Sequence, residues 1–374
     1  MIVSVSTSTP CRMLPEPNQC CIMVTGGAGF IGSAVIRQLI ADRYAAIINV
    51  DVLTYAGNES TLIKESAYPG YRHERADIRD AGEIRKLVDR YRPDAIMHLA
   101  AESHVDRSSD GPADFINTNI HGTYNLLEAV RAEDERRATE SDAQAARVRF
   151  HHISTDEVFG SLGATGLFNE DSSYQPNSPY SASKAASDHL VRAWGETFGI
   201  NAVVSNCSNN YGPYQYPEKL IPVVLHQAMA GNPIPVYGKG ENIRDWLYVD
   251  DHARALVMVM SRGQSGRTYN IGGDAERTNL EVVETICREL DEIAPRTEGG
   301  YSDLITFVKD RPGHDFRYAI DASRIKTELG WQPEERFESG IRRTIEWYLN
   351  NQQWVEEVGG KQSASTRLGL GGSR

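Results

Sequence analysis

Short apolar runs alternate with segments of helical period through the first half of the chain. The apolar runs lack strict two-residue alternation and lie at 20–25, 46–51, 94–101, 148–154 and 201–207. The helical segments between them lie at 30–42, 81–91, 114–137 and 178–199. Because strands without alternation are buried on both faces, this pattern predicts an α/β fold with a doubly wound parallel sheet. The charged end of the 114–137 helix is expected to be solvated.

The regular alternation of strands and helices ends after about residue 208. Pro and Gly become frequent in stretches such as NNYGPYQYPEKLIP, and strands and helices continue irregularly. We therefore expect a smaller, mixed C-terminal domain packed against the sheet. The expected divisions are a disordered extension, a sheet domain to which later segments can return, a second domain and a flexible tail, at 1–20, 21–207, 208–354 and 355–374.

Composition narrows the class of protein. The 374 residues carry a net charge of −12 and a pI near 5.4, which disfavours general binding to nucleic acid or to a membrane surface. No apolar run is long enough to span a bilayer. The cysteine count is odd and includes no C-x-x-C. This argues against a disulfide framework or a structural zinc site and predicts a cytoplasmic protein without a metal.

A glycine-rich turn, VTGGAGFIGS, joins the first strand to the first helix. Its glycines allow close approach of a pyrophosphate to the helix N-terminus, and an acid about 20 residues later, Asp51, can accept both ribose hydroxyls. A glycine turn alone could be ligand-free, but strand, helix and acid together favour NAD over NADP. The turn resembles the nucleotide-sugar branch of the extended short-chain dehydrogenase/reductase superfamily, with a Rossmann-type sheet. Its expected cofactor contacts are Gly26, Gly29, Phe30, Ile31, Gly32 and Asp51.

Tyr180 and Lys184 lie one helical turn apart in SPYSASKAAS. Residues at this spacing share a helix face, and a nearby ammonium lowers the pKa of a phenol. The pair could then take a proton from a sugar hydroxyl, with the Thr155 hydroxyl bonding the same oxygen. The plainer alternatives are an exposed helix pair and a Thr that satisfies local backbone. The position of the pair resembles that of the superfamily's catalytic Tyr and Lys.

Two adjacent carboxyls, Asp156 and Glu157, follow the strand that ends at Thr155. Like-charge repulsion and partial burial favour one neutral and one ionised carboxyl, which suits a general acid beside a general base. Oxidation of a sugar at carbon 4 makes the carbon-5 proton acidic, so such a pair could expel water across carbons 5 and 6. An acidic surface turn is the alternative reading.

Longer motifs make the resemblance more specific. STDEVFG, YSASK, HLAAESHVDRS, YGKGENIRDWLYVDDHARAL and DRPGHDFRYAID are similar to the dTDP-glucose 4,6-dehydratase family, over about 21–354. The resemblance implies that Glu157 is the carbon-5 base and that Asp156 is the acid for the leaving hydroxyl. It also implies a homodimer, in which helices near 114–131 and 178–198 form a four-helix bundle. The extension of about 20 residues, the short segment after Phe159 and the C-terminal tail depart from the family pattern.

The resemblance also implies further ligand contacts. Additional NAD contacts are Asp77, Ile78, Ala100, Ala101 and Ser103. The substrate dTDP-glucose is expected to meet Asn209, Lys219, Leu220, Pro235, Tyr237, Arg244, Asn279, Arg311 and His314. Cations in loops rich in Pro and Gly beside aromatic residues suit a pyrophosphate, although any one of them alone could be a solvated surface charge.

Two other functions are compatible with the sequence. One is a UDP-sugar epimerase or decarboxylase of the same fold, and the other is a non-catalytic dinucleotide-binding protein. The Asp156–Glu157 pair disfavours the epimerase, and the retention of both carboxyls with Tyr180 and Lys184 disfavours the non-catalytic protein. The choice of thymine over uracil rests on the resemblance alone.

Overall fold

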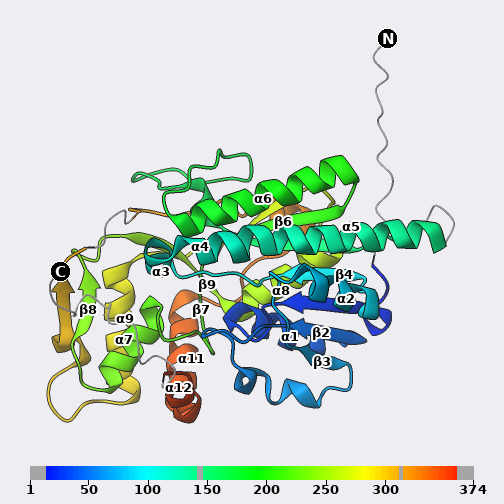
Figure 1. Ribbon diagram of the computed structural model, residues 1–374. Coiled ribbons are helices and arrows are strands. Elements are labelled where there is room, and N and C mark those ends of the chain that lie inside the picture. The colour runs from blue at the N-terminus through cyan, green and yellow to red at the C-terminus, as the bar shows by residue number, and fades with distance from the viewer. Residues whose placement is uncertain (1–13, 141–145, 311–314, 360–374) are drawn as a thin grey trace.

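Seven parallel strands form the central sheet of the protein, seen in a computed structural model that describes residues 14–140, 146–310 and 315–359 (Figure 1). The strand order is β10-β6-β5-β4-β1-β2-β3, and every pairing is parallel. The strands are β1 (Cys21–Thr25), β2 (Ala46–Val50), β3 (Tyr71–Glu74), β4 (Ala95–His98), β5 (Arg149–Thr155), β6 (Asn201–Cys207) and β10 (Thr268–Ile271).

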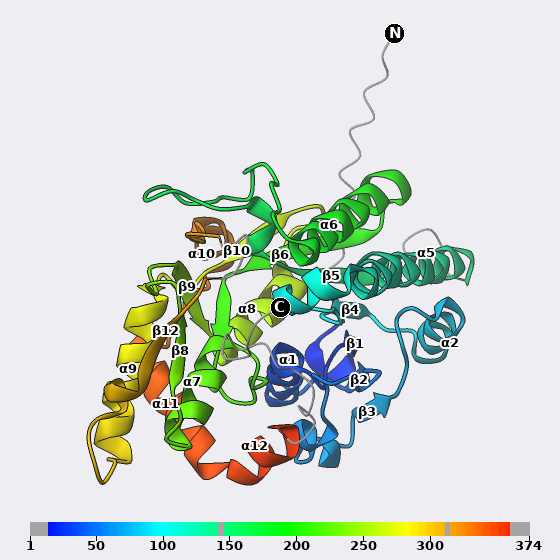
Figure 2. The same cartoon turned by 60° about the vertical axis from the view of Figure 1, so that its left-hand side comes forward.

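Helices cover both faces of this sheet (Figure 2). On one face α1 (Phe30–Ala41) packs against α8 (Val249–Arg262). On the other, α5 (Thr123–Glu140) lies between α2 (Ala81–Tyr91) and α6 (Pro179–Phe198). Two separate apolar cores result, because each buried strand sends alternate side chains to opposite faces. The predicted doubly wound parallel sheet is confirmed.

The chain approaches α5 through a continuous helical run. It consists of α3 (Val105–Asp110), α4 (Pro112–Phe115) and a π-helical segment (Ile116–Gly122) that leads directly into α5. Asn119 of the π-helical segment holds the loop after β4, since it accepts from the Glu102 N–H and donates to the Glu102 carbonyl, both at 2.9 Å. Its amide also donates to Ser183 Oγ of α6 at 2.8 Å. This segment therefore fixes a loop at the carboxyl end of the sheet.

The C-terminal part contains two small sheets with their own apolar core. The sheets are β7 (Asn209–Tyr211), β9 (Ile243–Tyr248) and β11 (Glu276–Thr278), and β8 (Ile234–Tyr237) with β12 (Ile305–Val308). The helices are α7 (Leu220–Met229), α9 (Asn279–Ile293), α10 (Ser323–Leu329), α11 (Phe337–Asn350) and α12 (Gln352–Gly359). The chain crosses between the two parts, because α8 and β10 belong to the large sheet and its helical layer.

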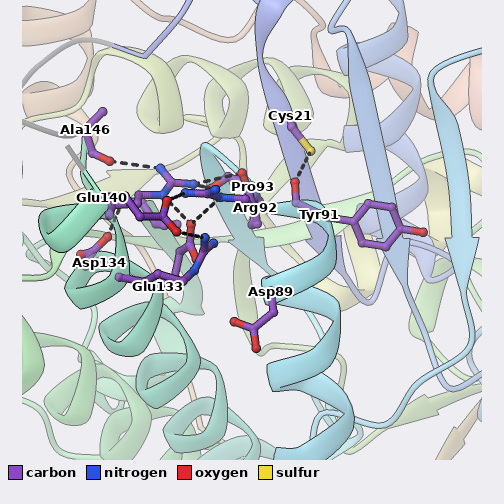
Figure 3. Close-up of polar contacts among 12 residues, drawn as sticks. Cys21, Asp89, Tyr91, Arg92, Pro93, Glu133, Asp134, Glu140 and Ala146 are labelled. Carbon is purple, nitrogen blue, oxygen red and sulfur yellow. Dashed lines mark hydrogen bonds and ion pairs between the residues drawn. The ribbon is translucent and has the colours of Figure 1, made fainter.

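The C-terminal end of α5 differs from the solvated end that its sequence predicts. Glu133 has a fully buried side chain, and its carboxylate pairs with Arg92, Arg136 and Arg137. Figure 3 shows this cluster beside Glu140, which pairs with Arg92 at the exposed edge. The expected solvation holds for the exposed Glu140 and fails for Glu133, because Arg137 also donates to the Arg92 and Pro93 carbonyls, which closes the loop between α2 and β4 over Glu133.

Both ends of the described chain are anchored. Pro17–Gln19 form a short 3-10 helix and Cys20 is buried, whereas residues 1–13 of the expected extension lie outside the described residues. Trp354 of α12 donates to Thr61 Oγ1 at 3.2 Å, within the short 3-10 helix Glu59–Leu62. Residues 360–374 of the expected tail lie outside the described part. No helix in the described ranges combines the length and apolarity needed to cross a membrane.

Candidate active site

A cavity of about 840 Å³ opens where the strands of the large sheet end. It is lined by the residues that follow β2, β4, β5 and β6, and by the turn after β1. This edge of a doubly wound sheet is the usual place for a ligand. The predicted residues that it brings together are Gly26, Gly29, Phe30, Ile31, Gly32, Asp51, Asp77, Ile78, Ala100, Ala101, Ser103, Thr155, Asp156, Glu157, Tyr180, Lys184, Asn209 and Lys219.

The glycine turn has the geometry that a dinucleotide pyrophosphate requires. Gly26 adopts φ +73°, and a Cβ there would lie 2.7 Å from Ala100 Cα. A Cβ at Gly32 would collide with the Gly26 carbonyl oxygen. Helix α1 begins with Gly29 as its N-cap, and no side chain caps it. The amides at its N-terminus are therefore available to an anion, and the turn fits NAD.

Asp51, the predicted ribose contact, lies in the cavity lining with both carboxylate oxygens bonded to backbone. Its Oδ2 accepts from the Ala28 N–H at 3.0 Å, and its Oδ1 accepts from the Leu53 N–H at 2.8 Å. Each carboxylate oxygen can accept a second hydrogen bond, so both ribose hydroxyls could be held. Burial raises the pKa of Asp51, while the two backbone N–H groups act in the opposite direction.

The two carboxyls after β5 occupy different environments. Thr155 caps the 3-10 helix Asp156–Phe159, and its Oγ1 accepts from the Glu157 N–H at 3.3 Å. Asp156 is 2% exposed, and its Oδ2 has no hydrogen-bond partner among the described residues. Burial, with the charges of Glu157 and Asp245, raises the pKa of Asp156 well above its ordinary value. Burial therefore favours the neutral form of Asp156, which lies beside a half-buried Glu157.

Tyr180 and Lys184 enter the cavity from the first turns of α6. The helix begins with Pro179 and with a capping box in which Ser178 and Ser181 bond each other's backbone. Burial, followed by the charge of Glu157, raises the pKa of Tyr180 well above 10. Burial therefore outweighs the lowering expected from Lys184. The Lys184 ammonium instead donates to the Ile153 carbonyl at 2.8 Å.

Sequence reasoning missed a charged cluster at the cavity wall. The Arg107 guanidinium lies 3.7 Å from the centre of the Tyr55 ring, and its Nη2 lies 3.4 Å from Glu218 Oε2. Tyr55 also donates to Glu102 Oε2 at 3.4 Å. Arg107 lies in α3, and Tyr55, Glu102 and Glu218 lie in loops far apart in the chain. The sequence signal for Glu102, Arg107 and Glu218 was their place in HLAAESHVDRS and PEKLIP, motifs that carry charges next to predicted contacts, and Tyr55 lies in neither motif.

The other predicted substrate contacts lie away from the lining of this cavity. Arg244 is buried in β9, where its guanidinium donates to the Phe316 and Asp315 carbonyls and lies 4.3 Å from the centre of the Tyr318 ring. Leu220 and Asn279 begin α7 and α9, and Pro235 and Tyr237 lie in β8. Arg311 and His314 fall outside the described residues. The substrate roles of all these residues stay predictions.

Comparison with known proteins identifies the family. A curated dTDP-glucose 4,6-dehydratase of Neisseria meningitidis is 57% identical over 354 residues, which cover 94% of this chain and 99% of that protein. The chain belongs to the dTDP-glucose 4,6-dehydratase family. A broader family model, described as GDP-mannose 4,6 dehydratase, matches residues 23–344. The resemblance predicted from the motifs is confirmed.

Solved structures agree with this membership. A dTDP-glucose 4,6-dehydratase from Bacillus anthracis in complex with NAD is 40% identical, with a TM-score of 0.80 over 91% of this chain and 99% of that one. A UDP-glucose 4-epimerase from Thermotoga maritima with UDP-glucose is 27% identical, with a TM-score of 0.77 over 88% and 99%. Fold alone therefore separates dehydratases from epimerases poorly.

Proposed function

We propose that this protein is an NAD-dependent hydro-lyase that converts dTDP-glucose to dTDP-4-keto-6-deoxyglucose. The observation that carries the proposal is the contrast between Asp156 and Glu157. A buried carboxyl with an unpartnered oxygen and a raised pKa can donate a proton, and a less buried neighbour can accept one. Oxidation or epimerisation of a sugar needs no such acid beside a base, whereas elimination of water does.

Different residues of the cavity are proposed to carry out different steps of the reaction. Tyr180, with Thr155 bonded to the same substrate oxygen, takes the proton of the carbon-4 hydroxyl. Glu157 then removes the proton from carbon 5, which the new ketone has made acidic. Asp156 protonates the hydroxyl that leaves carbon 6, so that water is lost. Bound NAD would supply the chemistry of hydride transfer, from carbon 4 at the start and to carbon 6 at the end, and a proton returns to carbon 5 to complete the reduction.

The nucleotide half of the substrate would extend beyond the carboxyl pair. Asn209 and Lys219 line the cavity, and Lys219 Nζ donates to the Ser103 carbonyl at 3.0 Å, which ties the predicted substrate side to the cofactor side. Arg244 and Arg311 are proposed to meet the phosphates, and Tyr237 to pack by the base. The remaining proposed contacts are Leu220, Pro235, Asn279 and His314.

We also propose that the protein works as a cytoplasmic homodimer. The helical run through α5 and the neighbouring α6 expose Ile116, Tyr124 and Phe198, at 47%, 45% and 42% of their surface. Large exposed apolar side chains spaced along adjacent helical segments favour a helical interface. In each subunit, residues 21–207 would bind NAD, together with the returning α8 and β10, and residues 208–354 would bind the nucleotide sugar.

Incubation with dTDP-glucose tests the function. The product is a 4-keto-6-deoxy sugar, which gains an ultraviolet absorbance in base, and we expect this signal with the purified protein and NAD. Parallel incubations with UDP-glucose and UDP-glucuronic acid test for an epimerase and a decarboxylase. Turnover of a UDP-sugar without the signal from dTDP-glucose would overturn the proposal, and NAD binding without turnover of any sugar would favour the non-catalytic protein.

A further inference from the structure

A buried polar network connects Lys184 to residues that have no place in the reaction above. Lys184 Nζ lies 3.4 Å from His152 Nε2, and the same ring nitrogen lies 3.1 Å from Asp188 Oδ1. The other oxygen of Asp188, Oδ2, accepts from Ser154 Oγ at 2.8 Å and from the Tyr174 hydroxyl at 2.9 Å. Strand β5, helix α6 and the loop before α6 therefore meet at one carboxylate.

This network is buried. His152 is fully buried, and Lys184 and Asp188 are each 4% exposed. Lys184 and Asp188 are four residues apart in α6, so they lie on the same face of the helix. An ammonium held out of water is strongly disfavoured unless an opposite charge compensates it. The network needs an anion close to Lys184.

Asp188 is the group that meets this need. Burial lowers the pKa of Lys184, and Asp188 is the largest influence in the opposite direction. Burial raises the pKa of Asp188 to about 6, against the lowering effect of Lys184 and of the hydrogen bonds from Ser154 and Tyr174. The carboxyl is therefore ionised at neutral pH.

The other titratable groups around the pair carry no compensating charge. Burial holds the pKa of His98 and of His152 well below 6.5, so both rings are neutral at neutral pH. Burial likewise raises the pKa of the Cys207 thiol to about 12 and raises that of the Tyr180 phenol. These groups face the network from β4, β5, β6 and α6.

We propose that Asp188 is a positioning residue of the active site, which is oriented by Ser154, Tyr174 and His152 and keeps Lys184 in its ammonium form. A neutral Lys184 would lose the charge that a proton-accepting Tyr180 requires beside it. The inference rests on the proposed function for its kinetic test, but the charge on Lys184 can be measured without turnover.

The decisive variant is Asp188→Asn, which removes the charge and keeps the shape. Loss of a nearby opposite charge lowers the pKa of an ammonium by about one to three units. We expect the alkaline limb of the kcat/KM profile to move to lower pH by at least about one unit. The direct readout is NMR titration of protein labelled with 13C at the lysine ε-carbons, with the Lys184 signal assigned by its absence in Lys184→Arg. That signal should titrate at lower pH in Asp188→Asn.

Two further variants keep the test specific. Asp134→Asn is the matched control, because burial also raises the pKa of Asp134 to about 6 and its carboxylate accepts from the Val148 N–H, far from the cavity lining. It should leave both pH readouts unchanged. Tyr174→Phe removes one hydrogen bond from the Asp188 carboxylate, so it should raise the pKa of Asp188 and shift the acid limb of the profile upward even if Asp188→Asn folds poorly.

The outcomes separate the two proposals. Unchanged pH readouts in a folded Asp188→Asn, with only a lower melting temperature, would reduce Asp188 to a structural role and overturn the inference. An unmoved acid limb in Tyr174→Phe would do the same where Asp188→Asn does not fold. Failure of wild-type protein to convert dTDP-glucose, with the Lys184 signal still shifted by Asp188→Asn, would overturn the proposed function and retain the inference.

Discussion

Replacement of Asp156 by Asn separates activity from stability in a way that tests the assigned proton donor. The substitution is nearly isosteric and removes the acidic proton from a side chain that is 2% exposed. General acid catalysis typically contributes about 10²- to 10⁴-fold. We therefore expect turnover of dTDP-glucose to fall by about that factor, or by about 3–5 kcal/mol in the activation free energy. Oxidation at carbon 4 should persist.

The stability of the same variant should change in the opposite direction. Because folding raises the pKa of Asp156, its contribution to stability is complete below the unfolded pKa of 3.8 and is lost as pH rises toward the folded pKa. Asn has no such dependence. Over that window wild type loses about 1.4 kcal/mol per pH unit relative to Asp156→Asn. For a chain of 374 residues this is a melting-temperature difference of about 2 °C per pH unit in favour of the variant.

Two measurements on the same samples test whether Asp156 is the proton donor. Single-turnover absorbance should show reduced nicotinamide that accumulates without product in Asp156→Asn, and scanning fluorimetry from pH 5 to about 8 should show the widening gap in melting temperature. A variant that is less stable than wild type by a margin that stays constant from pH 5 to about 8 would mean that Asp156 is ionised in the folded protein. It could not then be the proton donor.

Three other substitutions test separate parts of the structure. Glu157→Gln should retain oxidation at carbon 4 but block elimination and the exchange of the carbon-5 proton with solvent, and rapid loss of water in this variant would refute its role as base. Asp51→Asn should weaken NAD binding by about 10- to 100-fold in calorimetry, because hydrogen bonds to a charged group contribute about 1.5–3 kcal/mol, and an unchanged affinity would remove Asp51 from the ribose site. Glu133→Gln should lower the free energy of unfolding by about 1–3 kcal/mol, since it removes the counter-charge of Arg137, whose side chain is 11% exposed. The exposed neighbour Glu140 gives the matched control, Glu140→Gln, which should lose much less in the same denaturant titration, and equal losses would contradict the burial argument.

The strands of the large sheet could be predicted where the local sequence carries an apolar run. The strands without such a run could not. Strands β1, β2, β4, β5 and β6 were found because both faces are buried, which leaves nearly continuous apolar runs. Strand β3, with the sequence YRHE, lies at the sheet edge and is only partly buried, so no apolar run marks it. Strand β10 pairs with β6 through Thr268 and Val204, across a separation that no local pattern reveals.

The candidate site could likewise be predicted in part: its residues could be found from local motifs, but their environments could not. The glycine turn, Asp51, the Thr155–Glu157 stretch and the Tyr180–Lys184 pair each lie within one short motif, and folding brings all of them to one cavity. Their electrostatics could not be read from the motif, because burial and not the neighbouring charge sets the direction at Tyr180. A sequence shows that Lys184 lies four residues from Asp188 but not that both are buried. Once both are buried, an ammonium that needs a counter-charge and a carboxylate held by β5 and by the loop before α6 cannot be treated as independent. The catalytic pair has to be understood as Tyr180 and Lys184 together with the acid beside them.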